Sequence, residues 1–271
     1  MAITKFKPII WSSKILTGFR ENAIFAGLAN SEYTGDAKSG STVRIVSAVD
    51  VAVKDYKANG RTTSADDITD TSQDLLIDQE KNFDFYVDDI DRAQAAGNLS
   101  AYTESAAAGL VEDADKFLAA LLILQGTAIT STPATDGKSA WNVVRDLKKA
   151  LDKAKVPAGN RVFAANAEFT SLLLENDAKL MQADVSGTTA GLREAAIGRL
   201  LGFDSYSSEN LPTTNKPQIT AWWKPSLAYV SQIEKTEAMR ADNKFADRLR
   251  GLHVYGGKLI RPTAAVSWTA A

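Results

Sequence analysis

Four aspartates close together in the chain carry the oxygen ligands that hard cations prefer: Asp84, Asp88, Asp89 and Asp91. Asp84 and Asp88 fall on the solvent side of an expected strand, and Asp89 or Asp91 is placed to begin the helical region that follows. The glycine and the terminal glutamate of a calcium-binding loop are missing at the required spacing. We therefore expect solvated charges and no metal site, with a metal-dependent hydrolase using Asp84–Asp91 kept as an alternative.

Few other residues are suited to catalysis. The chain has no cysteine and one histidine, which excludes disulfides, thiolate zinc sites, cysteine nucleophiles and histidine pairs. His253 lies in an expected strand, where we predict a packed or surface residue. Gly137-Lys138-Ser139 is similar to the end of a phosphate-binding loop, but Thr132 replaces the glycine required five residues earlier. We expect no enzyme activity and no cofactor.

The composition is that of a globular protein. Of 271 residues, 45% are hydrophobic and 24% charged, which fits one large or two modest domains. The net charge of −2 argues against a dedicated nucleic-acid reader, and we expect Trp222 and Trp223 to pack in a core rather than stack on bases. No apolar run reaches the roughly 20 residues of a membrane span. Residues 1–10 lack the apolar stretch of a signal peptide, so we expect a cytoplasmic protein.

Two segments, 43–53 and 75–87, alternate between apolar and polar residues, which is the period of a half-buried strand. Polar, turn-rich residues 58–71 lie between them. The pattern predicts a hairpin whose arms, each about 13 residues long, reach roughly 40 Å. A lone two-stranded ribbon is marginally stable in water. The hairpin therefore needs a partner surface, from its own domain or from another subunit.

Apolar residues spaced by three and four positions predict one long helix over 99–125, ended by Gly126. Its polar side is expected to hold Glu104, Glu112, Asp113, Asp115 and Lys116. Ser139 is expected to cap a second helix and Asn166 a third. Strands are expected at 161–165, 218–223, 234–240 and within 252–268. This order predicts an α+β chain, with residues 127–138 as a subdomain boundary.

Four stretches of the chain carry a family resemblance. Gly198–Pro212 (GRLLGFDSYSSENLP) resembles the GRLxGFxxYxSxNLP segment of phage major capsid proteins, and Phe245–Pro262 (FADRLRGLHVYGGKLIRP) resembles their FADxVRGLxVYGxKxxRP ending. Ile10–Leu16 (IWSSKIL) is similar to their N-terminal arm, and Asp88–Gln94 (DDIDRAQ) matches the VDDxDxAQ between hairpin and helix. The matches occur in the expected order over nearly the whole chain.

The resemblance implies the Hong Kong 97 capsid fold, with an N-terminal arm, an extended E-loop hairpin, a P domain with a long spine helix, and an A domain. The expected division is 1–41 for the arm, 42–95 for the E-loop and a P-domain strand, 96–135 for the spine helix, 136–243 for the A domain, and 244–271 for the return to the P domain. In such shells the E-loop lies over an adjacent subunit, which would supply the missing partner of the hairpin.

The family also implies the partners of the chain. These are further copies of itself in hexamers and pentamers, a separate scaffolding protein, a portal and non-specifically held double-stranded DNA, without a membrane. The expected location is the virion capsid, assembled in the host cytoplasm. Subunit contacts are expected at Arg61, Asp66 and Asp67 on the hairpin tip and at Trp11 in the arm, and no motif marks Lys54 or Lys57 for cross-linking. A cellular encapsulin compartment, which shares the fold, is an alternative.

Overall fold

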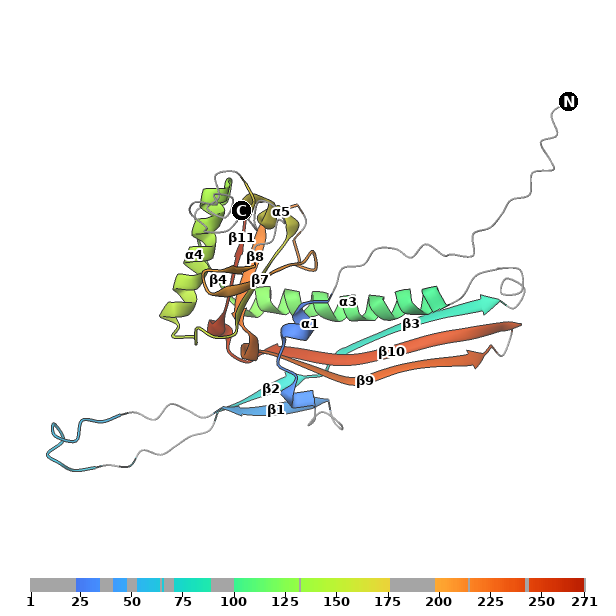
Figure 1. Ribbon diagram of the computed structural model, residues 1–271. Helices are drawn as coiled ribbons and strands as arrows, with labels where there is room; N and C mark the ends of the chain where they lie inside the picture. The colour runs from blue at the N-terminus through green and yellow to red at the C-terminus, as the bar shows by residue number, and fades with distance from the viewer. Residues whose placement is uncertain are drawn as a thin grey trace.

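The long helix α3, Ser100–Gln125, lies against strands of both larger sheets (Figure 1). It confirms the predicted helix over 99–125. The computed structural model describes residues 23–34, 41–47, 53–63, 65, 71–88, 100–131, 133–175, 198–213, 215–241 and 244–270. None of the helices in these ranges is long and apolar enough to cross a membrane.

A six-stranded sheet stands at the C-terminal end of α3, with its strands in the order β4-β11-β8-β5-β7-β6. Its strands are β4 (Thr127–Ala128), β5 (Arg161–Ala165), β6 (Arg199–Leu200), β7 (Phe203–Ser207), β8 (Gln218–Trp223) and β11 (Ala265–Thr269). Helices α4 (Gly137–Lys153) and α5 (Ala167–Leu173) cover one face, and α3 with the short α1 (Phe25–Leu28) covers the other. Both faces are therefore buried, which explains the nearly continuous apolar runs of β5 and β8.

Adjacent tryptophans in β8 serve the two faces separately, because successive side chains of a strand point to opposite sides. Trp222 is fully buried on the α3 side and stacks on Phe25 with ring centroids 5.4 Å apart. Trp223 packs against the cluster under α4. Both rings are packing residues, as predicted.

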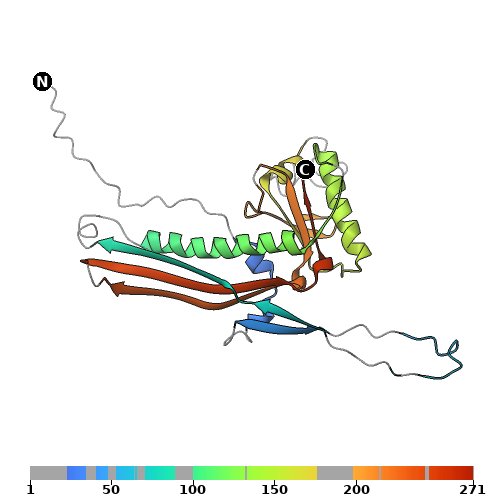
Figure 2. The ribbon, with the colours of Figure 1, turned by 180° about the vertical axis from the view of Figure 1, so that it is seen from behind.

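A three-stranded antiparallel sheet, β3-β10-β9, runs alongside α3 (Figure 2). Its strands are β3 (Gln79–Asp88), β9 (Leu227–Arg240) and β10 (Ala246–Leu259). Sheet membership therefore differs from the expected division of the chain. β9 lies outside the sheet that holds most of 136–243, and β11 returns to the six-stranded sheet although it belongs to 244–271.

The second arm of the expected long hairpin is divided between two strands. Within the described residues, which leave out 48–52 of the first arm, β1 (Thr42–Ser47) pairs with β2 (Thr71–Leu76), six residues against six. The second predicted arm, 75–87, breaks after Leu76, and its later part becomes β3, which pairs with β10 instead. This part of the prediction was wrong. The inner face of the β1–β2 ribbon packs Val43, Ile45, Leu75 and Ile77 against β9 and β10.

The residue that caps α5 was predicted correctly, and the residue that caps α4 was not. Asn166 caps α5 by accepting a hydrogen bond from the backbone N–H of Phe169 at 3.0 Å. The N-cap of α4 is Asp136, not Ser139. Asp136 accepts from the backbone N–H of Ser139 at 2.7 Å, and the Ser139 hydroxyl accepts from the backbone N–H of Asp136 at 3.0 Å. Ser139 is thus the third helical residue of a reciprocal capping box.

Candidate functional site

Of the four candidate metal ligands, Asp84 pairs with a cation of its own chain. It lies on β3, where the Arg248 Nε donates to its two carboxylate oxygens at 2.9 and 3.0 Å. The side chain of Asp88, and the whole of Asp89 and Asp91, lie outside the described residues. In the described part of the chain, no three His, Cys, Asp or Glu side chains are grouped to hold a metal ion.

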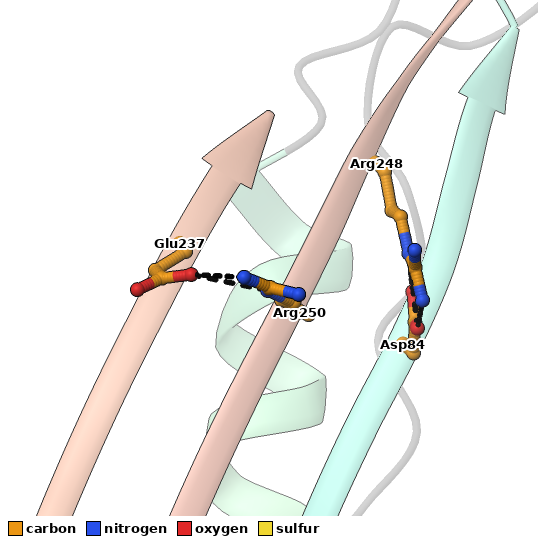
Figure 3. A network of polar contacts seen from close by, with 4 residues as sticks. All are labelled: Asp84, Glu237, Arg248 and Arg250. Carbon is orange, nitrogen blue, oxygen red and sulfur yellow. Dashed lines mark hydrogen bonds and ion pairs between the residues drawn. The ribbon is translucent and has the colours of Figure 1, made fainter. Parts of the chain in front are cut away.

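The Asp84–Arg248 pair belongs to a cross-strand row on the face of the three-stranded sheet away from α3 (Figure 3). Arg250 lies opposite both Asp84 and Glu237 in the strand register. Its Nη2 donates to Glu237 Oε2 at 2.6 Å. Hydrogen bonds from Arg248 and Arg250 lower the pKa values of the Asp84 and Glu237 carboxyls. Asp84, Glu237, Arg248 and Arg250 line, with their neighbours, a groove of about 480 Å³ on this face.

His253 is a packed residue, as predicted, with 6% of its surface exposed. Its Nε2 lies 3.1 Å from the Ser231 hydroxyl, and its ring lies 4.8 Å from that of Tyr255. The Tyr255 hydroxyl donates to Asp113 of α3 at 2.7 Å. Burial, and then this bond, raise the pKa of Tyr255. The histidine belongs to a polar layer that joins the sheet to α3.

The hairpin tip forms a turn held by its own hydrogen bonds. The Asp55 carboxylate accepts from the backbone N–H of Lys57 at 2.9 Å, and the Arg61 N–H donates to the Tyr56 carbonyl at 2.9 Å. Arg61 has a φ of 60°, in the left-handed region that side chains rarely adopt. Its side chain is exposed, and its role as a subunit contact stays a prediction. The other expected contact residues, Asp66, Asp67 and Trp11, lie outside the described residues.

Two apolar side chains near this tip are open to solvent. Val53 is fully exposed, at 100%, and Tyr56 is 55% exposed. Figure 1 shows that this segment projects far from both sheets. The segment therefore exposes apolar surface whose removal from water would be favourable.

Asp115 is a functional candidate that the sequence analysis placed wrongly. It was expected on the polar side of the long helix, but it is fully buried. One carboxylate oxygen accepts from the backbone N–H of Ala26 at 3.1 Å, and the other from the side-chain amide of Asn210 at 2.8 Å. The residue thereby joins α1, α3 and the loop after β7. Its spacing of three and seven residues from Leu118 and Leu122 was the signal that would have placed it in the buried stripe.

Two glycines of β10 allow other elements to approach its backbone. A Cβ at Gly256 would lie 2.2 Å from the carbonyl oxygen of Leu76 and 2.8 Å from the Cα of Ile77, where the ribbon crosses the sheet. A Cβ at Gly257 would lie 2.8 Å from the Leu118 Cδ2 on α3. The two adjacent glycines therefore allow close approach on opposite faces of β10. The ribbon and α3 thereby pack on opposite sides of β10.

Comparisons with known proteins found a matching family model and similar structures. A family model described as "Phage capsid protein" matches residues 74–268. A structure from Mycobacterium phage Che8 is similar over 98% of each chain, with 48% sequence identity and a TM-score of 0.93. The capsid of cyanophage P-SCSP1u covers 100% of this chain and 95% of its own, with 17% identity and a TM-score of 0.85.

A virus-like particle from Pyrococcus furiosus covers 84% of this chain and 86% of its own, with 14% identity and a TM-score of 0.56. At that level of identity the likeness concerns the fold alone. None of the curated proteins compared with the sequence matches it.

Proposed function

The chain belongs to the phage capsid protein family, and we propose that it is the major subunit of an icosahedral shell that encloses packaged double-stranded DNA. Proteins of this family are structural components of the virion and form shells; the family is not one of enzymes. The proposal extends this to the symmetry of the shell and to its contents. Hexamers and pentamers of the subunit, a separate scaffolding protein and a portal complete the proposed assembly in the host cytoplasm.

The observation that carries the proposal is the projecting tip with Val53 and Tyr56 exposed. A tip with such groups has a use in a protein whose copies lie side by side, where a neighbour can cover it. Repetition by symmetry then multiplies each modest contact into a stable container. In this proposal residues 42–76 are the E-loop, and the contact residues Arg61, Asp66 and Asp67 face the adjacent subunit.

The remaining elements take the other family names in the same proposal. The spine helix is α3, and the P domain is α3 with the β3-β10-β9 sheet. The A domain is the six-stranded sheet with α4 and α5, and residues 1–41, including Trp11, form the N-terminal arm. This assignment moves β9 into the P domain and β11 into the A domain relative to the segments expected from the sequence.

The proposal is tested by replacing Val53 and Tyr56 together with serine in the full-length chain. Neither side chain belongs to a buried cluster of the described residues, so the free energy of unfolding should change by no more than about 0.5 kcal/mol. Shell formation, followed by negative-stain electron microscopy, should be lost or greatly reduced.

A matched control is Val111→Thr on α3, where the side chain is 44% exposed; this variant should form shells normally. Uniform shells from the double variant would contradict the role of the tip. Wild-type particles that enclose a protein cargo instead of DNA would contradict the proposed contents and favour an encapsulin-like compartment.

A further inference from the structure

The outer face of α4 concentrates positive charge in an otherwise acidic chain. Residues 145–155 contain five lysine and arginine residues and two aspartates, a local charge of +3 in a chain of net charge −2. The inner face of the helix is buried against the six-stranded sheet by Val143, Val144, Leu147 and Leu151. The cations therefore lie on a face that is fixed in place by packing, and both views show α4 on the outside of its body (Figures 1 and 2).

Both aspartates of residues 145–155 accept hydrogen bonds from other side chains of this chain. Asp152 accepts from Lys148 and from the buried Arg161, each at 2.6 Å. Asp146 accepts from Arg145 at 3.0 Å and from Ser131 at 2.9 Å. Three further lysines are exposed and have no ion pair within the described part of the chain: Lys149, Lys153 and Lys155. Their charges are available to an external anion.

The spacing and chemistry of this face suit a phosphate backbone better than a protein surface. From Arg145 to Lys153 the helix rises about 12 Å, a length over which one strand of duplex DNA presents about four phosphates. Arg145, Lys148, Lys149, Asp152 and Lys153 line a shallow groove of about 480 Å³. Lysine is depleted from protein–protein interfaces, whereas DNA interfaces are strongly positive. No large apolar side chain is exposed on the described residues of this helix.

We propose that the outer face of α4 and the turn after it, through Lys149 and Lys153 on the helix and Lys155 in the turn, bind the phosphate backbone of the packaged DNA. This rests on the proposed function, because it names the contact between the shell and its contents. Lysine ammonium groups are mobile point charges, so the contact should not depend on the base sequence of the duplex.

The test is amine acetylation of DNA-filled particles and of the same particles after release of their DNA, with each lysine quantified by mass spectrometry. Lys149 and Lys153 should be acetylated several-fold more slowly in filled particles than in emptied ones. Lys57 and Lys235, elsewhere in the chain, should react equally in both. Equal reactivity of the α4 lysines in both states would overturn the proposal, as would equal protection in DNA-free shells that contain scaffolding protein.

A charge-reversed chain provides the second measurement. Lys149→Glu with Lys153→Glu should leave shell formation unchanged. Duplex binding by the full-length subunit is measured at several salt concentrations. The slope of the logarithm of the binding constant against the logarithm of the salt concentration should become shallower by about two, one for each phosphate contact removed. Lys216→Glu with Lys235→Glu is the matched control, with the same change of charge at two exposed sites outside α4, and its slope should stay nearer that of the wild type. An equal loss in both variants would contradict a site on α4, whereas failure of every chain to form shells would contradict the proposed function instead.

Discussion

The carboxylate of Asp115 accepts a 2.8 Å hydrogen bond from the side-chain amide of Asn210, which lies 95 positions further along the chain. The second oxygen of the same carboxylate accepts from Ala26, so one buried side chain connects three elements. A buried charge is costly unless hydrogen bonds satisfy it. The arrangement therefore depends on both donors being held in place.

Asp115→Asn is expected to destabilise the subunit. The amide keeps the shape of the carboxylate but replaces one acceptor with a donor, which then faces another donor. The loss should be about 1–3 kcal/mol in the free energy of unfolding, measured by urea denaturation of the full-length chain. Glu104→Gln, at an exposed position of the same helix, is the control and should change little. An unaltered unfolding midpoint for Asp115→Asn would show that the junction contributes nothing.

Gly256→Ala is expected to disturb the crossing of the ribbon over β10. The added Cβ meets the backbone carbonyl of Leu76 at 2.2 Å, and a backbone atom cannot turn away as a side chain can. Overpacking of this kind costs roughly 1–3 kcal/mol. Gly159→Ala is the control, because nothing lies within 4 Å of a Cβ there. Thermal unfolding of the two variants should separate them clearly; identical melting temperatures would contradict the close approach.

The ion pairs of the three-stranded sheet predict an acid-sensitive stability. The folded-state pKa of Asp84 lies below its usual value of about 3.9, because Arg248 binds the ionised form. Its contribution is therefore present above the unfolded-state pKa and is lost as the pH falls through the folded-state pKa. The urea midpoint of Asp84→Asn should lie below that of the wild type at pH 7, and the difference should shrink as the pH falls below the unfolded-state pKa of about 4. A difference that does not shrink between pH 7 and this acid range would contradict the mechanism.

The sequence predicts which helices and strands exist better than it predicts which of them lie side by side. The helix over 100–125 follows from its apolar spacing, but its buried stripe was misplaced. Leu124 is 82% exposed, whereas Asp115 is buried. The C-terminal half of α3 contacts both sheets, so its covered surface is wider than one stripe, and hydropathy alone does not show which polar residue finds donors inside it.

The sequence did not predict that β2 ends at Leu76, for a related reason. Leu75, Ile77, Phe83 and Phe85 keep the same alternation through β2 and β3, although the two strands belong to different sheets. Alternation records which face of a strand is covered, and contains no information about which strand lies beside it. The pairing of β3 with β10 is set by residues more than 150 positions away.

The crossing at Gly256 also has a mechanical meaning. The ribbon is held where the backbone of Leu76 lies against β10, and its tip lies far beyond that point (Figure 1). A load on the β1–β2 ribbon at Leu76 therefore meets the backbone of β10 directly, and Gly257 and Leu118 connect β10 with α3. In an assembled particle, strain between neighbouring subunits would reach the interior of each one along this route.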